Sequence, residues 1–205
     1  MIFNCQVATS THRQITTLTT ISIIIAIYNR KDELFELLNS LSHQTDKDFE
    51  IIIVDDGSKI DLRPTTALFN ESLNIQFYRK DNSGPGLSRN YGARRAKNDW
   101  LVFVDSDVIV EKDYIENIKK NITEIPCDAF GGADKAHKGF NLMQKAISYS
   151  MTSVFTTGGI RGSKKAVTKF QPRSFNMGVR KSSFEKVGGF SEMRIGEDPD
   201  LSMTL

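Results

Sequence analysis

A chain of 205 residues is long enough to bury one sizeable core, and 39% hydrophobic with 25% charged residues is an ordinary composition for a globular domain. The formal net charge of +2 argues against a protein that binds nucleic acid through an overall positive charge. Cys5 and Cys127 form neither a zinc-ligand spacing nor a disulfide framework, which favours a reducing compartment and hence a cytoplasmic location.

Residues 1–20 contain six threonines and show no clear period. We treat them as a leader of unknown structure, because a disordered segment and an edge strand fit them equally well. The apolar run that follows, Ile23–Tyr28, is far shorter than the roughly 20 residues that a membrane-spanning helix needs. The sequence therefore predicts neither a transmembrane segment nor a secretory signal.

Strand and helix patterns alternate from residue 21 onward. We predict buried strands at 21–27, 50–54, 75–78 and 100–104, and helices near 62–70 and 87–97. A further helix is expected after the first strand, because Leu34, Leu37, Leu38 and Leu41 recur on one helical face and Asn29 is a suitable N-cap. This alternation indicates an α/β fold with a Rossmann-like, mostly parallel sheet and helices on both faces.

Polar stretches follow three of the strands: YNR (28–30), DDGS (55–58) and DSD (105–107). The carboxyl ends of parallel strands are where such sheets bind ligands. The dinucleotide fingerprint G-x-G-x-x-G fails because position 89 is arginine, and no phosphate-binding P-loop motif occurs.

The acidic pair Asp105 and Asp107 is a candidate metal site. In an extended segment the two side chains point the same way, with Cα atoms about 6.5 Å apart. Two hard oxygen ligands suit Mg²⁺ or Mn²⁺, which would be completed by phosphate oxygens and water. A solvated turn is an alternative explanation of the same pair.

Four motifs in this order resemble the family 2 glycosyltransferases of the GT-A fold. Residues 21–58 are similar to that family's opening strand ending in Y-N, its S-L-x-x-Q-T segment and its strand ending in V-D-D-G-S. Residues 86–107 resemble its A-R-N-x-G and D-x-D segments, with Ser88 where the family usually has alanine. Residues 176–205 resemble its G-G-F and E-D region.

The resemblance implies a nucleotide-sugar-binding half, 21–107, and an acceptor-binding half of the same domain, 108–205, which we expect to be truncated at its C-terminus. On the donor side, Asp56 would hydrogen-bond the nucleobase, although a turn cap is an alternative role for it. The other implied donor-side residues are Ala26 and Tyr28 through their backbone, Asp105 at the ribose and metal, Asp107 at the metal, and Arg89 at a phosphate.

On the acceptor side, the resemblance implies that Asp198 is the general base of an inverting transfer, with Glu197 as the second candidate. Asp198 also precedes Pro199, which is typical of a helix N-cap, and the two roles are compatible. Gly189 and Phe190 would shape the acceptor wall. The expected partners are a nucleotide-sugar donor, most simply a UDP-sugar, and a glycan or lipid-linked acceptor in polysaccharide biosynthesis.

Two other functions fit parts of the sequence. A haloacid-dehalogenase-like phosphatase also has D-x-D after an apolar strand, with the first aspartate as nucleophile, but on its first strand. A glycosyltransferase-like domain that binds nucleotide or glycan without turnover is the non-enzymatic alternative.

Charge is unevenly distributed along the chain. Residues 135–184 contain ten basic residues and no Asp or Glu: Lys135, Lys138, Lys145, Arg161, Lys164, Lys165, Lys169, Arg173, Arg180 and Lys181. The segment is either a solvated basic face or a surface that meets anions, namely a lipid diphosphate, the donor diphosphate or the inner face of a membrane.

Overall fold

The computed structural model describes residues 3–6, 19–132, 174–193 and 196–205. Its strands are β1 (Phe3–Gln6), β2 (Ile21–Ile27), β3 (Phe49–Asp55), β4 (Ile75–Arg79), β5 (Trp100–Val104), β6 (Ala129–Gly132) and β7 (Asn176–Arg180). Its helices are α1 (Lys31–Ser42), α2 (Arg63–Ala67), α3 (Pro85–Ala93), α4 (Tyr114–Glu124), α7 (Lys181–Lys186) and α8 (Glu197–Thr204).

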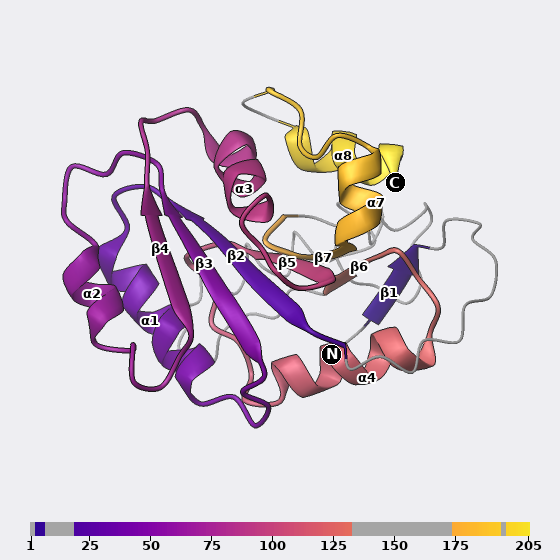
Figure 1. Ribbon diagram of the computed structural model, residues 1–205, viewed down its shortest axis with the longest axis horizontal. Coiled ribbons are helices and arrows are strands. Elements are labelled where there is room, and N and C mark those ends of the chain that lie inside the picture. The colour runs from indigo at the N-terminus through magenta and orange to yellow at the C-terminus, as the bar shows by residue number, and fades with distance from the viewer. Residues whose placement is uncertain (1–2, 7–18, 133–173, 194–195) are drawn as a thin grey trace, which may run out of the picture.

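The strands form one seven-stranded sheet in the order β1-β6-β7-β5-β2-β3-β4 (Figure 1). The pairs β5–β2, β2–β3 and β3–β4 are parallel, which confirms the α/β prediction for the first half of the chain. The second half adds antiparallel pairs, because β7 lies between β5 and β6 and β1 pairs with the outer edge of β6.

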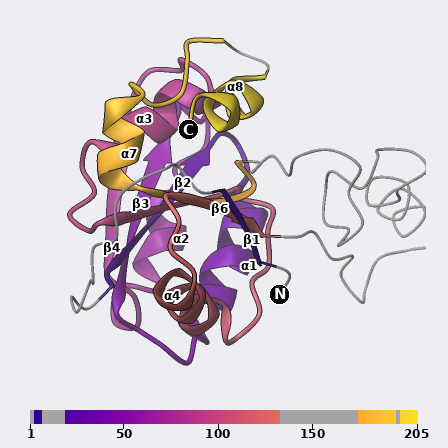
Figure 2. The same cartoon turned by 90° about the vertical axis from the view of Figure 1, so that its right-hand side faces the viewer.

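Helices cover both faces of the sheet, and each face has its own apolar core (Figure 2). One core lies under α1, α2 and α4 and includes the predicted leucine face of α1. The other lies under α3, α7 and α8. Strand β2 serves both cores, since Ile23 and Ile25 belong to the first and Ile24 to the second, as expected for alternating side chains of a fully buried strand.

The S-L-x-x-Q-T segment joins α1 to α4. Gln44 is buried, and its amide donates to the carbonyl of Glu111 at 2.8 Å while its Oε1 accepts from the N–H of Ile115 at 3.1 Å. Ile115 lies in the first turn of α4, where N–H groups have no partner inside the helix. Gln44 therefore fixes the start of α4 against the end of α1.

The prediction that Asn29 caps α1 is wrong. The N-cap is Arg30, with no side-chain cap, and Asn29 adopts a left-handed backbone with φ of 55°. Its N–H donates to Oγ of Ser58 at 2.8 Å, and its Oδ1 accepts from the N–H of Lys59 at 2.7 Å. Asn29 thus ties the loop after β2 to the loop after β3, and this tertiary role overrides the local capping preference.

Candidate active site

The polar stretches that follow β2, β3 and β5 meet at one edge of the sheet, as predicted. Asn29 and Ser58 join the first two loops, and an ion pair of 2.8 Å between Arg30 and Asp107 joins the first and third. These contacts follow from the order β5-β2-β3, which places the three carboxyl ends side by side.

Asp105 and Asp107 do not share one side of an extended segment, so that expectation is wrong. Strand β5 ends at Val104, and the chain then turns, with the N–H of Val108 donating to the carbonyl of Asp105 at 3.3 Å. The two carboxylates meet different arginines: Asp105 pairs with Arg89 at 2.7 Å and Asp107 with Arg30 at 2.8 Å.

Arg89, on α3, is the more buried of these two arginines. Its side chain is only 7% exposed, and it binds two carboxylates at once: Asp105 through Nη2 at 2.7 Å and Glu197 through Nη1 at 3.0 Å. Its guanidinium also lies 5.5 Å from the ring centre of Phe190. The predicted phosphate contact of Arg89 stays a prediction, while its carboxylate pairing is what the structure shows.

Asp56, after β3, holds the glycine loop in place. Its Oδ1 accepts from the ammonium of Lys80 and from the N–H of Ser83 at 2.9 Å, and its Oδ2 accepts from the N–H of Gly84 at 2.9 Å. Burial raises the pKa of Asp56, but the hydrogen bonds from Lys80, Ser83 and Gly84 outweigh it and hold the pKa below its ordinary value. A contact of Asp56 with a nucleobase stays a prediction.

The neighbouring Asp55 is fully buried and accepts from the N–H of Ser58 at 2.8 Å. Asp55 thus shapes the turn, as the alternative reading of the D-D-G-S stretch expects. Ala26 is half-buried and Tyr28 is exposed at the same strand ends. Their contact with a nucleotide stays a prediction.

The prediction that Asp198 is a helix N-cap is wrong. Helix α8 begins at Glu197 after a left-handed Gly196, so Asp198 and Pro199 lie inside the first turn. Asp198 is half-buried, and its Oδ2 accepts from the N–H of Ser174 at 3.4 Å. Its neighbour Glu197 is buried against Arg89.

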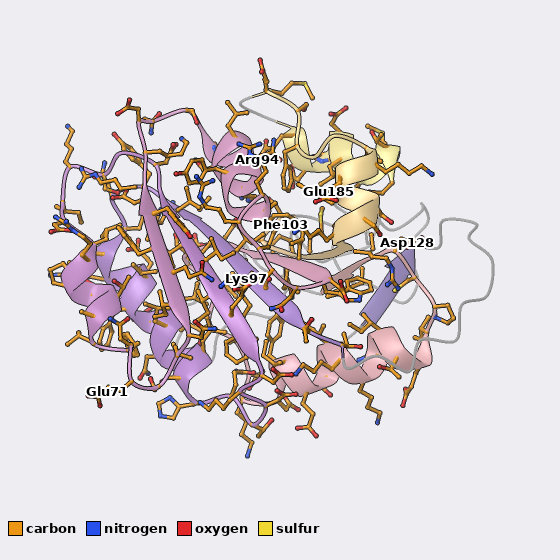
Figure 3. All side chains as sticks on the ribbon, in the orientation of Figure 1. Glu71, Arg94, Lys97, Phe103, Asp128 and Glu185 are labelled. Atoms are coloured by element: carbon orange, nitrogen blue, oxygen red, sulfur yellow. The ribbon has the colours of Figure 1, made fainter. Side chains whose placement is uncertain are left out.

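The G-G-F segment is held by Asn90, a residue that the sequence analysis did not assign. The side chain of Asn90 accepts from the N–H of Phe190 at 2.9 Å and donates to its carbonyl at 2.8 Å. The ring of Phe190 packs in the core, 4.9 Å from the ring centre of Phe103, whose position between the sheet and α7 can be followed in Figure 3. Phe190 is therefore a core residue, and its role in the acceptor wall stays a prediction; the segment that resembles A-R-N was the signal for Asn90.

Gly189 lines a pocket between α3 and α7. Arg94 and Glu185, labelled in Figure 3, also line it, together with Phe184 and Asn90. Asp105, Asp107 and Asp198 do not line this pocket, so the pocket is separate from these three carboxylates.

The residues present suit a divalent cation only with help from a ligand. Asp105 and Asp107 supply hard oxygen donors with side chains 37% and 53% exposed. Within the described residues, three or more Asp, Glu, His or Cys side chains do not gather into a cluster that could hold a metal. Diphosphate oxygens and water would have to complete the coordination, which is how Mg²⁺ is commonly held.

Comparison with known proteins identifies the family. The family model described as glycosyl transferase family 2 matches residues 22–188. The chain belongs to this family. The result contradicts the phosphatase alternative and agrees with the motifs on β2, β3 and β5.

Two curated members of the family illustrate the similarity. An uncharacterised glycosyltransferase of Haemophilus influenzae is 32% identical over 200 residues, which cover 90% of this chain and 61% of that protein. Another, from Rickettsia conorii, is 39% identical over 112 residues, covering 55% of this chain and 18% of that protein. The chain thus spans less than two thirds of the length of either relative.

Solved structures share the GT-A fold. The complex of S. aureus TarS (residues 1–349) with UDP has a TM-score of 0.71 and 24% identity, over 90% of this chain and 54% of that chain. A mannosyltransferase from Pyrobaculum calidifontis, in complex with GDP-Man and Mn²⁺, has a TM-score of 0.67 and 18% identity, over 92% and 51% respectively.

The basic segment 135–184 lies largely outside the described residues. Its two described basic residues have internal partners: Arg180 pairs with Asp128 at 3.2 Å, and Lys181 donates to the carbonyl of Ala96 at 2.7 Å. In the part of the chain that the structure describes, no helix is long and apolar enough to span a membrane.

Proposed function

We propose that this chain carries the catalytic centre of a glycosyltransferase that moves a sugar from a nucleotide-sugar donor to a hydroxyl of a glycan or lipid-linked acceptor, with inversion. The observation that supports it best is the buried Arg89, which joins Asp105 to Glu197, a residue 108 positions further along the chain than Arg89. This contact brings the carboxylates after β5 and those of α8 into one site. Such a site has a donor side and an acceptor side.

The donor side is formed by Asp56, Asp105 and Asp107. Asp56 would hydrogen-bond the nucleobase, and Asp105 would contact the ribose. Asp107 and Asp105 would hold Mg²⁺ or Mn²⁺. When bound, the ion would offset the charge that develops on the departing diphosphate.

On the acceptor side, Asp198 is the proposed general base. The acceptor oxygen forms a bond to the anomeric carbon while its proton passes to Asp198, and the bond between that carbon and the diphosphate breaks. The electron pair of the broken bond leaves with the nucleoside diphosphate. One displacement of this kind inverts the anomeric centre without a covalent intermediate.

A UDP-sugar is the preferred donor in this proposal. TarS is known as a complex with UDP-GlcNAc, while the mannosyltransferase neighbour holds GDP-Man with Mn²⁺. Because the sequence identities to these two proteins are low, the nucleobase of the donor has to be identified by comparing nucleotides directly.

Thermal unfolding with UDP-, GDP- and dTDP-sugars, with and without Mn²⁺, tests the donor side. A ligand that binds only the folded state at 100 times its Kd stabilises it by about 2.7 kcal/mol. We expect Asp107→Ala to remove the Mn²⁺-dependent part of this stabilisation. Asp48→Ala is the matched control. Asp48 is an exposed aspartate that pairs with Lys119, and it lies just before β3, at the end of this strand that is away from the candidate site.

Product analysis with the preferred donor then tests transfer. A free sugar or glycoside of inverted configuration supports the proposal. Nucleotide binding without any product in the full-length protein supports the non-catalytic alternative. Chelator-insensitive binding that Asp107→Ala does not change contradicts the metal assignment.

A further inference from the structure

Two carboxylates stand next to each other at the start of α8, and the structure treats them differently. The side chain of Glu197 is 8% exposed and faces Arg89, whereas Asp198 is half-buried and faces the N–H of Ser174. We propose that Arg89 is a positioning residue that commits Glu197 to a structural ion pair and so assigns the role of base to Asp198. This inference rests on the proposed function and deepens it.

The side chain of Glu197 packs closely against α3. A Cβ atom built at Gly86 would lie 3.1 Å from Cγ of Glu197 and 3.3 Å from the carbonyl oxygen of Ser191. The glycine at 86 therefore lets α3 approach Glu197 closely. Glu197 is thereby packed against α3, with its carboxylate on Arg89 of the same helix.

Electrostatics support the same division of roles. Removing one partner of a buried ion pair is costly, because the remaining charge is left desolvated and alone. A proton delivered to Glu197 would deprive the guanidinium of Arg89 of one of its two anions. The two side-chain hydrogen bonds of Arg89 go to Asp105 and Glu197, while Asp198 faces the N–H of Ser174, so a proton taken up by Asp198 leaves the pairing of Glu197 with Arg89 in place.

Arg89 also fixes the spacing between the two sides of the site. Its Nη2 holds Asp105 at 2.7 Å and its Nη1 holds Glu197 at 3.0 Å, so one rigid, planar group spans the turn after β5 and the first turn of α8. A base must lie on the face of the sugar opposite the leaving group, and small misplacements lower the rate steeply. Lysine lacks the planar fork of arginine and would have to hold both carboxylates from one compact nitrogen, so it would not keep the same spacing between them.

Turnover of four full-length variants tests the inference. We expect Glu197→Gln to keep turnover within about threefold of wild type, because an amide oxygen still accepts from Nη1 of Arg89. Asp198→Asn should lose about 10²–10⁴-fold, the usual contribution of a general base. The turnover of Glu197→Ala and of Arg89→Lys should fall between these limits, because each variant breaks the bridge but keeps the carboxylate of Asp198.

The pH profile separates positioning from catalysis. The acidic limb of the kcat profile reports the ionisation of the base. It should be retained in Glu197→Gln and in Arg89→Lys, and it should be absent from the residual activity of Asp198→Asn. A loss of turnover and of the acidic limb in Glu197→Gln would instead make Glu197 the base, and wild-type kinetics in Arg89→Lys would show that the bridge positions nothing.

A measurement without turnover keeps this inference distinct from the proposed function. The double variant Arg89→Met/Glu197→Leu should lower the melting temperature by less than the sum of the two single variants, because they remove the same pair. Additive losses overturn the positioning role. If the two substitutions are coupled in stability but the protein transfers no sugar to any acceptor, the ion pair stands and the proposed function fails.

Discussion

Asp56→Asn is expected to loosen the glycine loop and lower stability. The amide keeps one oxygen, but its NH₂ group must face either Lys80 and Ser83 or the N–H of Gly84. One buried donor then lacks an acceptor, at about 1–3 kcal/mol, and the ion pair with Lys80 is replaced by a weaker hydrogen bond from the ammonium to an uncharged amide. Together we expect the free energy of unfolding to fall by about 2–4 kcal/mol, or roughly 5–15 °C in melting temperature for a chain of this size.

The loss should depend on pH with a defined sign. Because the pKa of folded Asp56 lies below its ordinary value of 3.8, its carboxylate stabilises the fold fully above that value. This contribution disappears as the pH falls through the lowered pKa. The difference in stability between wild type and Asp56→Asn should therefore be full near neutral pH and shrink in acid.

Thermal and urea unfolding of both proteins, from about pH 7 down to about pH 3, provide the assay. Asp48→Asn is the control, since Asp48 also pairs with a lysine but its side chain is 63% exposed, and exposed pairs contribute about 0.2–1 kcal/mol. If Asp56→Asn and Asp48→Asn lose equally little stability at neutral pH, Asp56 does not hold the glycine loop.

Three further predictions concern other residues. Arg30→Gln should raise Mn²⁺ affinity in the absence of nucleotide by about two- to fivefold in calorimetry, because it frees Asp107 from an exposed ion pair; unchanged affinity would show that the pair does not compete. Gly92→Ala should cost about 1–3 kcal/mol in urea unfolding, since the new Cβ would lie 2.7 Å from Cγ2 of Ile24, and full stability would mean that α3 can move off the sheet. The protein should co-sediment with anionic liposomes at about 50 mM salt. Binding should fade at about 500 mM salt and should weaken in Lys164→Glu/Lys165→Glu. No binding at low salt removes the membrane hypothesis for residues 135–184.

The strands of the parallel half could be predicted from the sequence because their apolar runs are buried on both faces. Strand β5, for example, was expected at 100–104 and is found at Trp100–Val104. The order of these strands follows from no local pattern, however. Contacts such as Arg30 with Asp107, 77 residues apart, depend on that order, so the arginine partners of the acidic pair could not be foreseen.

Local rules failed where a tertiary partner or a glycine competed with them. Asn29 fits the N-cap preference, but its side chain and backbone bond Ser58 and Lys59 instead. Asp198 before Pro199 also fits it, yet Gly196 starts the helix two residues earlier. In both places the local geometry predicted from the sequence was wrong.

The position of β7 has a consequence for protein synthesis. Val104 at the end of β5 pairs with Asn176 of β7, so this side of β5 has no neighbour until the ribosome has made the chain beyond residue 180. An unpaired apolar strand edge is a template for aggregation. Residues 21–107 therefore leave this edge of β5 open until β7 has been made, and Arg89 can bridge Asp105 to Glu197 only after the last third of the chain has been translated.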